Sequence, residues 1–147
     1  MQYFGELIGA RLTGGEVFEL VGDVGAGKTT FTRGLARGLG ISEHIQSPTF
    51  TVSREYEGRD GLRLMHYDFY RLSEAGVMSD ELTETLADPK TITVIEWSGV
   101  AAEVLPVQRA SLQLLPVATN AEARQVVVSA TGQLAGIIEE ARDVLAA

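Results

Sequence analysis

Residues 17–30 read VFELVGDVGAGKTT. The first five are apolar or β-branched apart from Glu19, which is typical of a buried strand, and glycines recur through the next six. Apolar side chains then return with helical spacing over residues 31–39. The stretch therefore predicts a strand, a glycine-rich loop and a helix in direct succession.

The loop over residues 22–29 matches the pattern G-x-x-x-x-G-K-[ST] of a P-loop, in the strand–loop–helix context that this pattern requires. Its glycines let the backbone fold into a concave nest of N–H groups that can hold phosphate, and the helix N-terminus adds a positive dipole. We expect Lys28 to reach the β- and γ-phosphates, Thr29 to bind Mg²⁺ and Thr30 to contact the α-phosphate. The predicted nucleotide-binding residues are Gly25, Ala26, Gly27, Lys28, Thr29 and Thr30.

Two acidic residues each follow an apolar run: Asp68 comes after residues 64–67, and Glu96 after residues 92–95. P-loop proteins use such an acid, at the end of a neighbouring strand, to hold the magnesium shell. Asp68 is the better candidate for a water-mediated contact with Mg²⁺, whereas Glu96 could join the metal shell or orient the attacking water. The alternative for both is a solvated strand end. Strand alternation predicts that Glu96 and its neighbour Trp97 point to opposite faces.

Two further polar residues lie near these motifs. Thr49, in Ser47-Pro48-Thr49, occupies the place where many P-loop proteins keep a switch threonine that senses the γ-phosphate and magnesium. A proline-stiffened turn without a ligand role is the alternative. His66 lies inside an apolar strand, where a structural group is favoured over a contact with nucleotide or partner.

The remaining periodicity predicts the architecture. A hairpin of strands over residues 50–56 and 62–68 precedes a strand over 91–97 whose continuous apolar character places it centrally, and no element is predicted between residues 72 and 90. The other expected elements are helices over 3–12 and 134–145 and strands over 111–115 and 125–129. We predict one domain over residues 1–147, an α/β three-layer P-loop NTPase-like sandwich with a mixed, mostly parallel sheet and one antiparallel hairpin.

Composition limits the possible functions. The chain of 147 residues has 12 Lys and Arg against 20 Asp and Glu, so it lacks the broad positive surface of an autonomous nucleic-acid binder. With no cysteine and two histidines, thiolate or His-rich metal centres are excluded. Neither a signal peptide nor a membrane-spanning run is evident, so we expect a cytoplasmic protein.

Four ordered motifs span residues 22–106: GDVGAGKTTF at 22–31, SPTFT at 47–51, HYDFYRL at 66–72, and IEW at 95–97 with Leu105-Pro106 downstream. In this order and spacing they resemble the TsaE family of bacterial P-loop ATPases. That family serves in the threonylcarbamoyl modification of adenosine in tRNAs that read codons starting with A.

The resemblance implies an ATPase in which the P-loop, Thr49, Asp68 and Glu96 surround Mg·ATP. Hydrolysis would be slow and partner-dependent, and the protein would dock onto a TsaB–TsaD pair and reset TsaD between turnovers, meeting tRNA only indirectly. Arg124 resembles a family arginine near the base that could stack on adenine, against an ordinary surface role.

Other classes of protein use the same loop. A small-molecule or nucleoside kinase would transfer the γ-phosphate to a bound acceptor, but no arginine-rich lid insertion follows the predicted P-loop helix. A GTPase is disfavoured because neither lysine of the chain has an aspartate two residues later. A nucleotide-dependent scaffold without significant hydrolysis is the third alternative. ATP turnover with and without TsaB–TsaD separates these classes.

Overall fold

The computed structural model describes residues 1–23, 25–48, 52–70 and 78–147. Six strands form one sheet in the order β2-β3-β4-β1-β5-β6. They are β1 (Val17–Val21), β2 (Ser53–Glu57), β3 (Arg63–Asp68), β4 (Thr91–Glu96), β5 (Ala110–Val117) and β6 (Asn120–Ala130). The four inner strands run parallel, and β2 and β6 pair antiparallel with their neighbours at the two edges. The mixed sheet is as predicted, but it has a second antiparallel pair, β5–β6, besides the predicted hairpin.

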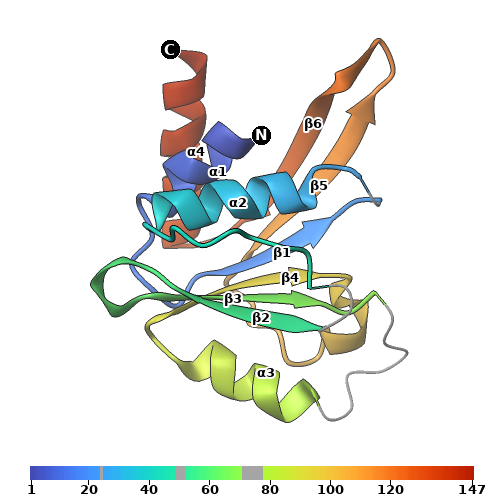
Figure 1. The fold of residues 1–147 in the computed structure, drawn as a ribbon. Helices are drawn as coiled ribbons and strands as arrows, with labels where there is room; N and C mark the ends of the chain where they lie inside the picture. Colours follow the sequence, from blue (N-terminus) through green and yellow to red (C-terminus); the bar gives the residue numbers. More distant parts are fainter. Residues whose placement is uncertain (24, 49–51, 71–77) are drawn as a thin grey trace.

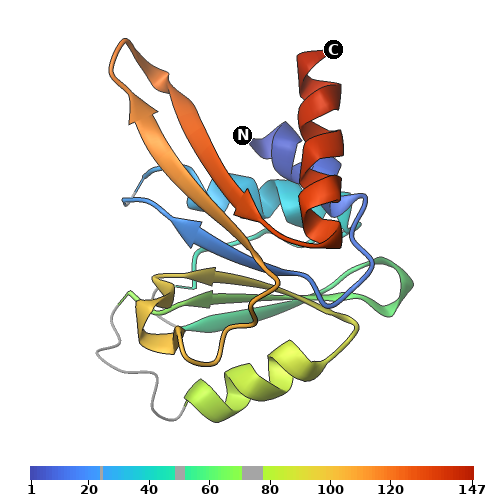
Figure 2. The same ribbon diagram turned by 180° about the vertical axis from the view of Figure 1, so that it is seen from behind.

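Helices cover both faces of the sheet (Figures 1 and 2). On one face lie α1 (Gln2–Gly9), α2 (Lys28–Gly38) and α4 (Gln133–Ala146), and on the other lies α3 (Met78–Ala87). Two short 3-10 helices, η1 (Arg59–Gly61) and η2 (Ser98–Ala101), follow β2 and β4. The predicted three layers are therefore present, whereas α3 was not predicted. Among the described residues, no helix has the length and apolar character needed to cross a bilayer.

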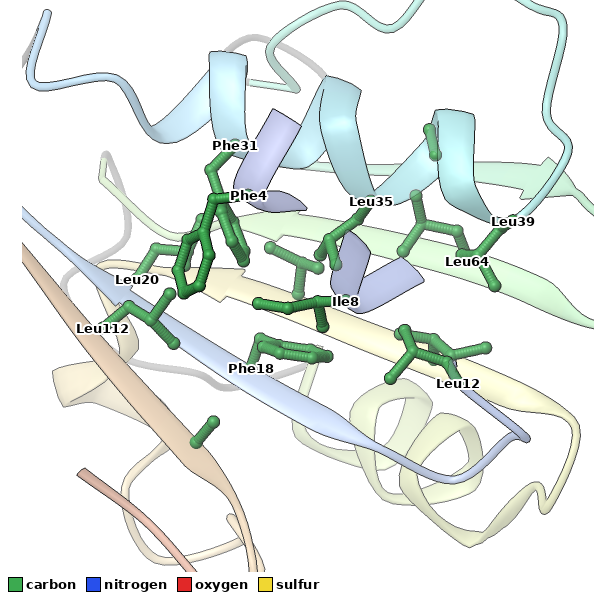
Figure 3. Packing of buried hydrophobic residues seen from close by; sticks show 14 of the residues in the cluster. Phe4, Ile8, Leu12, Phe18, Leu20, Phe31, Leu35, Leu39, Leu64 and Leu112 are labelled. Atoms are coloured by element: carbon green, nitrogen blue, oxygen red, sulfur yellow. The ribbon is translucent and has the colours of Figure 1, made fainter. Parts of the chain in front are cut away.

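Strand alternation divides the buried side chains into two clusters. Phe18 and Leu20 of β1 belong to the larger cluster beneath α1 and α2, whereas Val17 belongs to a smaller cluster on the α3 side. Figure 3 shows Phe4 and Phe31 meeting in the larger cluster, where their ring centroids are 6.1 Å apart. This packing fixes α2 over the sheet, and with it the loop that precedes α2.

Helices α1 and α2 touch backbone to backbone. A Cβ atom added to Gly34 would lie 2.1 Å from the main-chain oxygen of Gln2, and one added to Gly5 would lie 2.4 Å from the oxygen of Phe31. Any side chain here would separate the helices, because real Cβ contacts do not come this close. The glycines at this contact are Gly5, Gly9, Gly34 and Gly38.

Candidate functional site

The loop between β1 and α2 has the geometry of an anion-binding nest. Gly25 has φ 82° and Gly27 has φ 104°, left-handed values that side-chain-bearing residues rarely adopt. A Cβ at Gly25 would meet no atom within 4 Å among the described residues beyond its chain neighbours. The first N–H groups of α2 have no intrahelical acceptor, and the helix dipole adds positive potential at this end. The loop can therefore accept a phosphate group on its backbone.

Lys28, the first residue of α2, is only 6% exposed. Its Nζ donates to the main-chain oxygen of Gly22 at 2.7 Å and lies 3.6 Å from Oε1 of Glu96. The same nitrogen lies 4.4 Å from the centroid of the Trp97 ring. A carbonyl, a carboxylate and an aromatic face thus hold a largely desolvated cation beside the loop.

The two predicted acids lie side by side at the carboxyl ends of adjacent parallel strands. Asp68 of β3 is in register with Glu96 of β4. They are 4% and 3% exposed, so neither is a solvated strand end. Asp68 Oδ1 accepts a hydrogen bond of 2.9 Å from the Tyr70 N–H. Buried carboxylates near a lysine and a threonine hydroxyl are suited to Mg²⁺ that is shared with phosphate oxygens.

His66 belongs to this cluster. Its side chain is fully buried, and Nε2 lies 2.5 Å from Oε2 of Glu96. The sequence favoured a structural histidine and did not predict this contact. A signal was present, since residues two apart in a strand share a face and His66 precedes Asp68 by two.

One pocket of about 300 Å³ unites most of the predicted site. Asp68 and Glu96 line it opposite the loop and the start of α2. Its lining comprises Gly25, Gly27, Lys28, Thr29, Thr30, Ser47, Asp68, Tyr70, Glu96 and Trp97. Thr49 lies outside the described residues. No three His, Asp or Glu side chains gather into a metal site among the residues that the structure describes. Magnesium bound through nucleotide phosphates needs only one or two protein ligands, so the residues present fit it.

Trp97 corrects one expectation. Alternation predicted that its side chain points away from Glu96, but both contact Lys28. The strand ends at Glu96, and Trp97 adopts a left-handed conformation with φ 58° that turns the chain. Trp97 is 37% exposed, and its ring packs against that of Tyr70 with centroids 4.9 Å apart.

The segment after β4 is fixed from the α3 side of the sheet. Glu19 of β1 accepts a hydrogen bond from the Ser98 hydroxyl and another, at 3.1 Å, from Arg109 Nε. These contacts join β1 to the start of η2. They hold the backbone that carries Trp97.

Arg124 of β6 contacts the loop backbone. Its Nε and Nη2 donate to the main-chain oxygens of Ala26 and Gly25, both at 3.2 Å. Arg124 also borders a larger hollow of about 610 Å³ between the loop, η2 and β5. The structure therefore places Arg124, the predicted base-stacking residue, against the loop, where it donates hydrogen bonds to the main chain of Gly25 and Ala26.

Comparisons with known proteins give one answer. A family model described as threonylcarbamoyl adenosine biosynthesis protein TsaE matches residues 1–126. The chain is 39% identical over 120 residues to the tRNA threonylcarbamoyladenosine biosynthesis protein TsaE of Bacillus subtilis, covering 80% of this chain and 72% of that protein. It is 35% identical over 136 residues to the protein of the same name from Streptomyces coelicolor, covering 90% and 92%.

A solved structure is similar across almost the whole chain. The crystal structure of YdiB from Bacillus subtilis superposes with a TM-score of 0.74 at 32% identity, covering 97% of this chain and 86% of that one. The shared architecture is the predicted P-loop NTPase-like α/β fold.

Proposed function

The chain belongs to the TsaE family and so has a role in tRNA threonylcarbamoyladenosine biosynthesis, and we propose that it fills this role as an Mg·ATP-dependent ATPase acting on a TsaB–TsaD complex. The observation that carries the proposal is the buried Lys28 beside the glycine loop, 3.6 Å from a carboxylate at the end of a neighbouring strand. P-loop proteins that catalyse phosphoryl transfer use such a loop, its lysine and an acid at the end of a neighbouring strand.

Each residue has a proposed part. The backbone from Gly25 to Gly27 and the Lys28 amine bind the β- and γ-phosphates, and Thr30 contacts the α-phosphate. The Thr29 hydroxyl ligates Mg²⁺, the ion that offsets the negative charge developing on the phosphate oxygens. Thr49 is proposed to sense the γ-phosphate, and Arg124 to stack on the adenine in addition to holding the loop.

The two acids, Asp68 and Glu96, have different proposed roles. Asp68 is proposed to hold the magnesium shell through water. Glu96 is proposed either to join that shell or to orient the water that attacks the γ-phosphate. Both carboxylates are already buried. Exclusion of the remaining water when nucleotide binds would lower the local dielectric constant and so strengthen their electrostatic interactions.

The proposed partners are proteins. A net charge of −8 disfavours direct binding of tRNA, which we expect the protein to meet only through TsaB and TsaD. A cytoplasmic location is part of this proposal.

The test is ATP turnover with and without TsaB–TsaD, in the parent chain, Lys28→Ala and Lys90→Ala. We expect TsaB–TsaD to stimulate the parent. Lys28→Ala should weaken Mg·ATP binding measured by calorimetry by roughly tenfold or more, because a charged contact to phosphate is lost. Lys90, the only other lysine, is exposed and serves as the matched control.

Three outcomes contradict the proposal. If Lys28→Ala bound and hydrolysed ATP like the parent, the glycine-rich loop would not be the nucleotide-binding site. Transfer of the γ-phosphate to a small acceptor would identify a kinase. Nucleotide binding without turnover, even with TsaB–TsaD, would identify a scaffold.

A further inference from the structure

We propose that His66 is a positioning residue that orients the Glu96 carboxylate for ATP hydrolysis. The inference rests on the proposed function and deepens it, because it adds a residue that touches neither nucleotide nor metal.

The sheet brings the two residues together. His66 lies in β3, in register with Val94 of β4, and Asp68 two residues later is in register with Glu96. Side chains two apart in a strand share a face, so His66 lies on the same face of the sheet as both acids, one step back from the strand ends. The ring is fully buried and does not line the 300 Å³ pocket. His66 therefore acts through another residue.

The contact has one direction. A carboxylate only accepts hydrogen bonds, so Nε2 of His66 donates to Oε2 of Glu96 across 2.5 Å. The other ring nitrogen, Nδ1, has no hydrogen-bond partner among the described residues. In the described part of the chain, Glu96 is thus the group to which the buried ring is hydrogen-bonded.

The second oxygen of Glu96 points elsewhere. Oε1 lies 3.6 Å from Nζ of Lys28, on the side of the pocket. One carboxylate oxygen is therefore held by the sheet and the other is presented to the site. If a bound phosphate draws Lys28 away from Glu96, the hydrogen bond from His66 is the contact that still keeps the Glu96 carboxylate from rotating.

This arrangement predicts an effect on turnover more than on affinity. The proposed phosphate ligands are the loop and Lys28, whereas the hydrogen bond of His66 is to Glu96. Correct aim of Glu96 matters when metal or water must be placed in the transition state. Loss of a group that orients a site residue commonly lowers activity by about 10- to 100-fold.

The experiment compares His66→Gln with His66→Asn in the full chain. The glutamine amide can reach the place of Nε2 and donate to Glu96, whereas the shorter asparagine cannot. We expect His66→Asn to lower kcat by about tenfold with KM and the Mg·ATP Kd within about threefold of the parent, and His66→Gln to recover most of kcat. His44→Asn, at the exposed second histidine, is the matched control.

A second measurement protects against a folding defect. In a Glu96→Gln background, His66→Asn should cost no further kcat, because the group that it orients has already changed. The melting temperature of each variant is measured alongside.

The outcomes separate the inference from the function on which it rests. No nucleotide binding or turnover in the parent would defeat the proposed function. An active parent with unchanged kcat in His66→Asn would overturn the inference alone. Equal losses in His66→Asn and His66→Gln, or a full further loss in the Glu96→Gln background, would overturn it as well.

Discussion

The Lys28 amine has a counter-ion before any phosphate arrives. Glu96 lies between Lys28 and His66, so one carboxylate touches both the loop and the neighbouring strand. A phosphate bound as proposed would compete with Glu96 for Lys28. Removal of this carboxylate should therefore lower turnover without lowering the affinity for nucleotide.

Asp68→Ala and Glu96→Ala should each lower ATP turnover by roughly 100-fold while changing the Mg·ATP Kd by less than about tenfold, since their work concerns metal and water in the transition state. In Glu96→Ala the affinity should hold or rise, because Lys28 loses its competing partner. Calorimetry and steady-state turnover measure the two quantities.

Glu84→Ala, at an exposed acid of α3, is the control for these variants and should match the parent. Unchanged turnover in both Asp68→Ala and Glu96→Ala would mean that the two carboxylates have no part in hydrolysis.

Trp97 fluorescence should report nucleotide. It is the only tryptophan, and its ring lies 4.4 Å from the amine that phosphate would attract. Titration with Mg²⁺ and ATP or ADP should give a saturable change, smaller or absent in Lys28→Ala, with weak competition from GTP. A flat titration in a sample that binds ATP by calorimetry would place Trp97 outside the site.

The sequence predicted part of the cluster of residues around Lys28. Lys28 and the two acids were identified because the loop pattern and the strand ends are local signals. The Trp97 contact was not predictable, because it depends on a left-handed residue directly after β4. The His66–Glu96 pair also required the register between β3 and β4, which a single sequence does not state.

Among the elements, the contact of α1 with α2 is the most sensitive to one added methyl group. Gly34→Ala should destabilise the fold by about 2 kcal/mol or more, because the new Cβ would overlap the backbone of α1. Gly136→Ala is the control: it lies within α4, and among the described residues its new Cβ would meet no atom outside the helix within 4 Å, so it should stabilise by about 0.5–1 kcal/mol.

Urea unfolding of both glycine variants measures these changes. Equal effects would show that helix propensity alone matters and that the helices do not touch.

The turn between α3 and β4 gives a pH-dependent contribution. The N–H of Lys90, the Thr91 hydroxyl and the Arg63 guanidinium donate to Asp88, and they hold the pKa of its carboxyl below the ordinary 3.8. Because the pKa of Asp88 is lower in the folded than in the unfolded protein, its ionised carboxylate stabilises the fold at pH values above the ordinary 3.8. This stabilisation is lost as the pH falls through the pKa of the folded protein.

Asp88→Asn should therefore be less stable than the parent at neutral pH. The difference in unfolding free energy should shrink below about pH 4. Urea unfolding across this range measures it, and a difference independent of pH would contradict the assignment.

Elements with strong local signals were predicted well. The strand, loop and helix around residues 17–38 and the central β4 match the structure. Helix α3 was missed because its spacing of Met78, Leu82 and Leu86 is a weak pattern among polar residues. The β5–β6 pair is longer than predicted. Its outer part is exposed, so the sequence there lacks the alternation of apolar and polar residues by which a half-buried strand is recognised.

In the molecule as a whole, the candidate site lies at the edge of the sheet formed by the carboxyl ends of the parallel strands. The parallel strands β1, β3 and β4 end together there, which is where open α/β sheets place their ligands. The sequence predicted that the strand now seen as β4 lies centrally, but not the order of the strands. The β5–β6 arm reaches past this edge (Figure 1), and Arg124 links it to the loop.

The direct backbone contact between α1 and α2 also has a consequence for local opening. A helix of only eight residues ordinarily frays, and its amide hydrogens exchange quickly with solvent. Here α1 cannot separate from α2 without uncovering the backbone on which both pack. Deuterium uptake by α1 should therefore be as slow as that of α2 in the parent, and Gly34→Ala should speed both together. Fast exchange in α1 beside a protected α2 would show that the two helices open independently.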